Sequence, residues 1–236
     1  MHPMSALPSL TRRQLWTLIT LTLVWGLNWP IMKFGVTGFP PLTFRSLSML
    51  IGLPVLGLAL VLMKIPFRIP RSHWRELFTL AVFNMFIWHV LVILALPMLS
   101  SGRAAILGYT MPIFSAIWGV IWFNAPLRAR QWLGVGAAGI GVLLLLWNEL
   151  SHLSGQPVGV LMVLVAASTW AYGTQRLRHT PMAVPTLTIA FWMTSMTTVL
   201  LTVLACVFEQ DRWQMPTEST QWAILYNALG VFAFAQ

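Results

Sequence analysis

The chain has 236 residues and a mass of 26.5 kDa, and its composition is unlike that of a soluble protein. Charged residues make up 8% of the chain, whereas a typical soluble domain has about a quarter. Hydrophobic residues reach 58%, and the mean hydropathy is +0.77. These values exclude a soluble domain and a disordered chain, and they predict a protein whose solvent is the lipid bilayer.

The net charge of +9 would suggest a nucleic-acid partner if the chain were soluble. The basic residues instead fall in short clusters between apolar runs, which is typical of membrane topology, so nucleic acid is excluded as a partner. The single cysteine, Cys206, cannot form an internal disulfide. Because it lies within an apolar run, we expect it to be a buried small hydrophobic residue.

Eight stretches of the sequence contain no charged residue, and each is long enough for one spanning helix. A helix needs about 20 apolar residues to cross the hydrocarbon core. The stretches are Gln14–Met32, Ser46–Met63, Leu77–Gly102, Ala104–Leu127, Gln131–Asn148, Leu150–Gln175, Thr180–Phe208 and Ser219–Gln236. They predict seven complete helices and part of an eighth, joined by short loops.

The basic residues predict how these helices are oriented. Ten of them lie at one set of helix ends: Arg12, Arg13, Lys64, Arg68, Arg71, Arg75, Arg128, Arg130, Arg176 and Arg178. At the opposite set of ends, Arg212 lies in a loop and Arg103 lies at the edge of a span. Loops rich in Lys and Arg stay in the cytoplasm. We therefore expect a multi-pass protein of a bacterial inner membrane with a cytoplasmic N-terminus.

Several segments carry a resemblance to a known family. Helices one and six each place a tryptophan before a small residue, at Trp25-Gly26 and Trp170-Ala171. Further family-like segments are Trp25–Pro30, Phe44-Arg45, Ala95–Pro112, and Trp132–Gly136 with Gly139 and Gly141. Together they resemble the EamA-like permeases of the drug/metabolite transporter superfamily over essentially the whole chain.

The resemblance implies an all-α membrane protein, a multi-pass bundle of ten helices in two inverted five-helix repeats. Residues 1–149 would form the first EamA-like repeat, helices one to five. Residues 150–236 would form an incomplete second repeat, helices six, seven and part of eight. About seven and a half helices are therefore present, and we expect a longer natural protein with two to three further helices.

Polar residues within the spans are the candidates for solute contact, because polar groups in hydrocarbon usually face the bundle interior or a water-filled cavity. In the first span, Trp25 and Asn28 share a face, although Asn28 could equally join two helices. In the third, Trp88 and His89 are candidates, the alternative for His89 being a neutral histidine bonded to a neighbouring helix. For Arg45, at the family position of the second span, a structural role and a solute contact both remain open.

The fourth and sixth spans supply the other candidates. Tyr109 lies in the segment where the resemblance is densest, and a phenol with an apolar face and a polar tip suits a cavity wall. Tyr172 and Gln175 continue a polar stripe from Ser168 at helical spacing. The resemblance places the sixth span beside the cavity, which adds Trp170.

We interpret the protein as a secondary transporter that exports small metabolites, such as amino acids, by alternating access. The alternative is a multidrug or cationic-compound exporter of the same superfamily, but such pumps rely on a membrane-embedded Glu and the complete spans contain none. A remote alternative is an intramembrane enzyme, for which the sequence offers no nucleophile–base pair or metal motif. We expect no enzymatic activity, cofactor or metal; the partners are the lipid bilayer and a small-molecule solute, and a homodimer remains open.

The expected longer form is tested by the intact mass of the protein from its native host. We expect a mass greater by at least about 6 kDa, the weight of two to three helices. A mass of 26.5 kDa would contradict this expectation. It would leave either a homodimer that completes the cavity or a protein that transports nothing.

Overall fold

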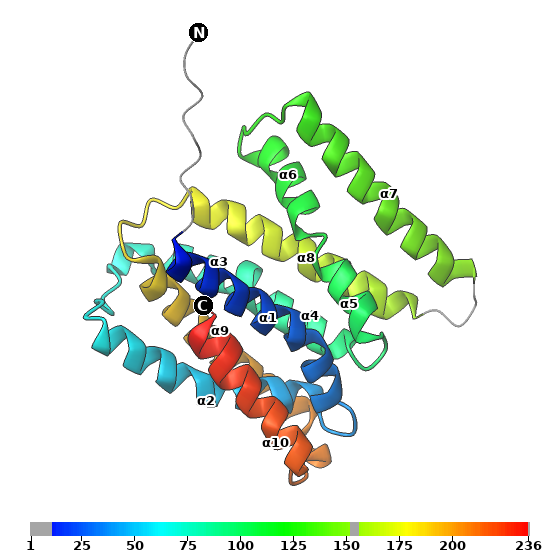
Figure 1. Ribbon diagram of the computed structural model, residues 1–236. Coiled ribbons are helices and arrows are strands. Elements are labelled where there is room, and N and C mark those ends of the chain that lie inside the picture. The colour runs from blue at the N-terminus through cyan, green and yellow to red at the C-terminus, as the bar shows by residue number, and fades with distance from the viewer. Residues whose placement is uncertain (1–10, 152–155, 236) are drawn as a thin grey trace.

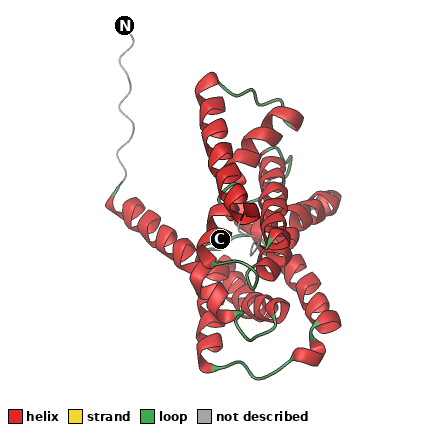
Figure 2. Ribbon diagram, turned by 90° about the vertical axis from the view of Figure 1, so that its right-hand side faces the viewer, coloured by secondary structure: helices red, strands yellow, loops and turns green. Residues whose placement is uncertain are grey.

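The computed structural model describes residues 11–151 and 156–235, and within these ranges it contains helices and loops but no strand (Figures 1 and 2). Six of the described helical segments are long and apolar enough to cross a membrane. The predicted all-α multi-pass class is therefore confirmed. Helices occur at all eight charge-free stretches.

The first four spans have different degrees of regularity. The first is α1 (Arg12–Gly35) and the second is α2 (Pro41–Leu62). The third runs continuously through η1 (Arg71–His73), α3 (Trp74–Leu80), the π-helical η2 (Ala81–Phe86) and α4 (Ile87–Ala95). The fourth is broken into α5 (Ser101–Gly108) and α6 (Met111–Trp122).

The remaining helical segments complete the described part of the chain. They are α7 (Ala129–Ser151), α8 (Pro157–Arg178), α9 (Thr186–Phe208), the short η3 (Gln210–Arg212), α10 (Glu218–Leu225) and the π-helical η4 (Tyr226–Phe234). Helix α10 continues directly into η4, so η2 lies inside one long helix and η4 forms the last part of another. Helix α7 lies at the edge of the molecule, beside α6 (Figure 1).

Helix starts are set by caps and prolines, and not by the nearest charge. The Thr11 side chain accepts a hydrogen bond from the Gln14 N–H and forms a capping box at the start of α1. Helices α2 and α8 begin at Pro41 and Pro157, a position where proline loses no helical hydrogen bond. Helix α2 therefore begins before the charge-free stretch at Ser46 and contains Arg45, at the position in the second span where the family resemblance placed it.

The surface between the two ends of the bundle is apolar, as a surface covered by hydrocarbon must be. Leu62 and Leu133 are among the most exposed large side chains, at 73% and 74%. Cys206 is also exposed, on α9, so the expectation of a buried cysteine was wrong. In a bilayer an apolar residue gains nothing by turning inward, because lipid tails are as apolar as the core.

Small residues allow close helix contact at both π-helical segments. A Cβ atom added at Gly173 of α8 would lie 2.6 Å from the Asn84 Cβ in η2. One added at Gly52 of α2 would lie 2.6 Å from the carbonyl oxygen of Ala228 in η4. Asn84 also donates hydrogen bonds to the Trp170 carbonyl (3.1 Å) and the Thr174 hydroxyl (2.9 Å), which joins η2 to α8.

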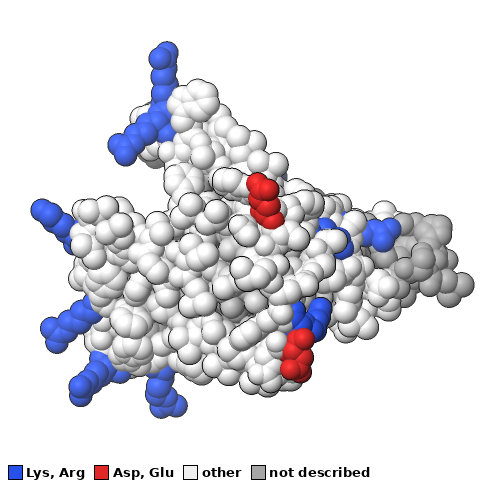
Figure 3. Space-filling model, turned by 90° about the horizontal axis from the view of Figure 1, so that it is seen from below, with Lys and Arg blue, Asp and Glu red and all other residues white. Residues whose placement is uncertain are grey.

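Charged side chains fasten the ends of the bundle. Lys33 donates hydrogen bonds to the Leu96 and Pro97 carbonyls at the end of α4. Glu209 is 3% exposed and accepts hydrogen bonds from the N–H groups of Leu42 and Thr43 at the start of α2. At the other end of the bundle, Arg176 and Glu76 form an ion pair of 2.6 Å. Lys and Arg side chains gather along the left edge of the view in Figure 3, while the visible acidic groups lie away from it.

We expect Gly173→Ala to destabilise the protein by about 1–3 kcal/mol, the usual cost of forcing extra volume into a packed interior. The added methyl would collide with the η2 backbone, since Asn84 Cα and N both lie 2.8 Å from the added Cβ. Thermal unfolding in detergent measures the effect. Gly136→Ala on α7 is the matched control, because no atom lies within 4 Å of its added Cβ. Equal melting temperatures for both variants would contradict the close contact.

Candidate functional site

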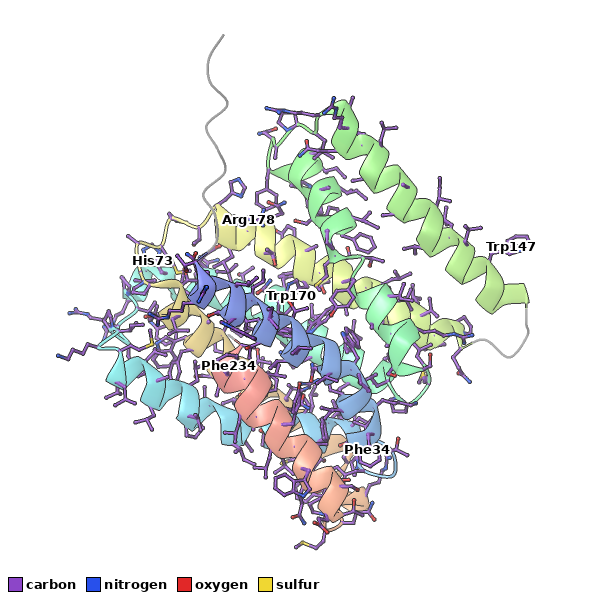
Figure 4. All side chains as sticks on the ribbon, in the orientation of Figure 1. Phe34, His73, Trp147, Trp170, Arg178 and Phe234 are labelled. Atoms are coloured by element: carbon purple, nitrogen blue, oxygen red, sulfur yellow. The ribbon has the colours of Figure 1, made fainter. Side chains whose placement is uncertain are left out.

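A cavity of about 500 Å³ lies between the broken fourth span and α8. Its walls come from the α5–α6 junction, from α6 and from one face of α8. The lining residues are Tyr109, Met111, Pro112, Ser115, Ala116, Leu127, Trp170, Ala171, Thr174, Gln175 and Arg178. Figure 4 shows Trp170 near the middle of α8 and Arg178 at its end, so the cavity follows α8 from its centre toward the basic end.

The break in the fourth span positions Tyr109 in the cavity wall. Helix α5 ends at Gly108 and α6 begins at Met111, with Pro112 in its first turn. The Thr110 hydroxyl turns back to donate a hydrogen bond to the Leu107 carbonyl at 2.6 Å. Tyr109 therefore lies between two helices and is 53% exposed.

Gln175 ties the two walls together. Its Nε2 atom donates hydrogen bonds to the Ser115 carbonyl (2.7 Å) and hydroxyl (2.9 Å), and the side chain is 8% exposed. The predicted residue Gln175 thus lines the cavity, but its amide nitrogen already donates hydrogen bonds to Ser115 of α6. Its contact holds α6 against α8 and fixes the width of the cavity.

A chain of aromatic rings leads from the cavity into the interior. The Trp170 ring centroid lies 5.2 Å from that of Trp88 on α4, and Trp88 lies 6.3 Å from Trp29 on α1. Trp29 lies 6.2 Å from Tyr109, which closes the chain on the cavity wall. Three of the predicted residues, Tyr109, Trp88 and Trp170, are therefore brought together from segments far apart in the sequence.

Trp29 is the member of this chain that was not selected from the sequence. Its ring packs against the end of α5, since a Cβ added at Gly108 would lie 2.7 Å from it. The available signal was the Trp29-Pro30 step, where proline removes a backbone hydrogen bond inside α1. The selected neighbour Trp25 is half-buried and forms neither a hydrogen bond nor a ring contact with the described residues.

Tyr172 faces a different side of α8. Residues two positions apart in an α-helix differ by about 200° around its axis, so Tyr172 and Trp170 point in nearly opposite directions. Tyr172 lines a second hollow of about 280 Å³ with Phe83, Trp118, Trp122, Ser168 and Thr169. Its hydroxyl accepts a hydrogen bond of 3.3 Å from Arg176. The structure does not bring this predicted residue to the cavity.

Asn28 and His89 lie deeper, and His89 shares an aromatic neighbour with Arg45, whose role the sequence left open. Asn28 is 3% exposed and His89 is 5% exposed. The Asn28 carbonyl oxygen and both ring nitrogens of His89 have no hydrogen-bond partner among the described residues. The centroids of the His89 and Phe232 rings lie 5.3 Å apart. The guanidinium of Arg45 lies 5.4 Å from the centroid of the Phe232 ring.

The described residues do not gather three or more His, Cys, Asp or Glu side chains within reach of one metal ion. The arrangement instead consists of aromatic walls with a few hydrogen-bonding groups. This combination binds small organic molecules, because the rings cover an apolar body and the polar groups fix its orientation.

The chain is similar to several known proteins. The profile of the EamA-like transporter family matches residues 13–147. The protein named uncharacterized transporter YoaV from Bacillus subtilis (strain 168) is 26% identical over 217 residues, which cover 90% of this chain and 73% of that protein. The protein named uncharacterized inner membrane transporter YedA from Escherichia coli (strain K12) is 26% identical and covers 66% of this chain and 50% of its own length.

Two further similarities concern solute and fold. A protein named probable amino-acid metabolite efflux pump, from Escherichia coli (strain K12), is 25% identical over 66% of this chain and 50% of its own length. A solved crystal structure aligns with 93% of this chain and 76% of its own chain at a TM-score of 0.63 and 18% identity, which shows a shared fold. The chain spans between half and about three quarters of the curated relatives named above. The family match covers more than half of the sequence, and the chain belongs to the EamA-like transporter family.

Proposed function

We propose that this chain is part of a secondary transporter that exports small metabolites such as amino acids by alternating access. The observation that carries the proposal is the cavity on α8 together with the aromatic chain of Trp170, Trp88, Trp29 and Tyr109. These groups come from α1, α4, the α5–α6 junction and α8. They would hold a small apolar or zwitterionic solute near the middle of the bundle.

The packing of the two halves supports two inverted repeats, with residues 1–149 as the first and 150–236 as the incomplete second. Helix α2 packs on the π-helical η4, and α9 packs on the π-helical η2. Likewise α1 packs on α10, and α8 packs on α3. In each pair, a helix from one proposed repeat contacts the third span of the other. Rocking one repeat against the other would open the cavity to alternate sides of the membrane.

The amino-acid assignment is supported by one relative, the protein named probable amino-acid metabolite efflux pump. Export of cationic drugs fits the structure less well, because the fully buried charge near the aromatic chain is the cation Arg45. The buried carboxylate of Glu209 is occupied by the first turn of α2. An enzymatic role is not proposed, since the site consists of aromatic walls and bound amides.

We expect Trp170→Ala and Tyr109→Ala to abolish transport while the protein still folds and inserts. Each change removes one ring of the cavity wall, and stacking on an aromatic ring is lost together with its buried area. The measurement is counterflow of a mixture of the twenty L-amino acids in proteoliposomes, with the exchanged solutes identified by mass spectrometry.

Trp147→Ala is the matched control, because Trp147 is 73% exposed on α7 and lies far from the cavity in Figure 4. It removes the same side chain and should leave transport unchanged. Transport at the wild-type rate in both Trp170→Ala and Tyr109→Ala would contradict the site assignment. Absence of exchange in the wild-type protein would count against the transport function itself.

The cytoplasmic N-terminus remains a proposal and has its own test. In a Cys206→Ser background, Ser72→Cys would place a thiol at the basic end of the bundle and Met215→Cys would place one at the opposite end. We expect a membrane-impermeant thiol reagent to label Met215→Cys but not Ser72→Cys in intact cells, because positively charged loops stay inside. Met215 is 90% exposed, so access to the reagent is assured. The reverse labelling pattern would show the opposite orientation.

A further inference from the structure

Arg45 is a buried cation without an acidic partner. Its side chain is 2% exposed, although it lies in the first turns of a membrane-spanning helix. The groups that contact it are neutral: the Asn227 carbonyl oxygen at 3.2 Å, the Met32 sulfur and the Phe232 ring. Its Nε atom has no hydrogen-bond partner, and no described carboxylate forms an ion pair with it. Arginine at a span end usually extends to the headgroups, and Arg45 does not.

Two other buried groups near Arg45 also lack partners. His89 packs on the same Phe232 ring as the guanidinium and has two unpaired ring nitrogens. Asn28, with its unpaired carbonyl oxygen, lies one turn before Met32 on the buried face of α1. An unpaired polar group in a dry interior is costly, and an unpaired charge is more so. The charge of Arg45 therefore calls for an anion that the described part of the chain does not supply.

This polar cluster adjoins the aromatic chain of the proposed cavity. Asn28 is followed directly by Trp29, and His89 is preceded directly by Trp88, and these two tryptophans contact each other. A solute whose apolar body lies against the rings would thus have its polar end directed toward Arg45. The cluster draws residues from α1, α2, α4 and η4, and so from both proposed repeats.

We propose that Arg45 binds the carboxylate of the transported solute and thereby selects carboxylate-bearing solutes over neutral and cationic ones. The inference rests on the proposed transport function and specifies its substrate class. The carboxylate would replace the Asn227 carbonyl oxygen as the acceptor of the guanidinium hydrogen bonds. An arginine can donate two parallel hydrogen bonds to one carboxylate, which an amide oxygen cannot accept. His89 and Asn28 would then contact the polar groups beside that carboxylate.

The test compares two matched pools of solutes in thermal unfolding of the purified protein in detergent. One pool holds the L-amino acids other than Asp and Glu, and the other holds their α-carboxamides, in which a neutral amide replaces the only carboxylate. We expect the acid pool to raise the melting temperature of the wild type and the amide pool to leave it unchanged. For Arg45→Gln, the acid concentration giving a half-maximal rise should increase roughly ten-fold to hundred-fold, as for loss of a charge-assisted hydrogen bond.

Two further variants separate binding from a purely structural role. Arg45→Lys keeps the charge but cannot donate two parallel hydrogen bonds to one carboxylate. The half-maximal concentration of the acid pool should therefore lie between those of wild type and Arg45→Gln. Asn227→Ala removes the neutral acceptor that competes with the carboxylate, so it should respond to the acid pool at the same or a lower concentration than wild type. If Arg45 were only structural, Arg45→Gln would lower the melting temperature yet respond to the acid pool as the wild type does.

The outcomes keep this inference distinct from the proposed function. An equal response to acids and amides, an unchanged response of Arg45→Gln, or no response of the wild type to either pool would overturn the carboxylate site. If Arg45→Gln does not fold, Arg45→Lys and Asn227→Ala decide the matter. If the acid pool stabilises the protein selectively but no exchange occurs in proteoliposomes, the carboxylate site is supported and the transport function is contradicted. Exchange of the amide pool in proteoliposomes would do the reverse.

Discussion

The structure depends on one constraint, the lack of water in the hydrocarbon core. Every backbone N–H and C=O group there needs a partner within the protein, so the chain crosses as helices. The same constraint keeps polar side chains between helices, where another group can satisfy them. Asn84 bonded to α8, Gln175 bonded to α6 and Lys33 bonded to the end of α4 are direct results. Arg45 is the charged member of the described buried groups that have an atom without a partner, and this is why we propose an outside ligand for it.

The two π-helical segments have a related structural role. Each widens a long helix where a glycine of a neighbouring helix approaches closely. Gly173 of α8 approaches η2, and Gly52 of α2 approaches η4. π-Helical turns occur often at functional sites, because they disturb the regular hydrogen-bonding of the helix. Here η2 leads directly into Trp88 and His89 on α4, and η4 carries Asn227 and Phe232. The irregular segments thus position both the end of the aromatic chain and the polar cluster.

In the proposed binding region, the cavity forms one end and the polar cluster around Arg45 forms the other. Trp170, Trp88, Trp29 and Tyr109 supply apolar surface, and Arg45, His89 and Asn28 supply polar contacts. Such a division suits an amphipathic solute with an apolar side chain and a carboxylate. The sharing of the region between both proposed repeats also fits alternating access, because movement of one repeat would separate the polar groups from part of the aromatic wall.

The sequence by itself determined the class, the approximate helices and a part of the site. Bilayer thickness and the absence of charge predicted helices at all eight stretches. The polar positions of the spans selected Trp88 and Gln175, while the family resemblance added Trp170 and pointed to Tyr109. Tertiary structure alone decided that Tyr172 faces another hollow, that Trp29 joins the aromatic chain, and that Arg45 turns inward. Helical periodicity states which residues share a face of one helix. It carries no information about which neighbour that face meets, because those contacts join residues far apart in the chain.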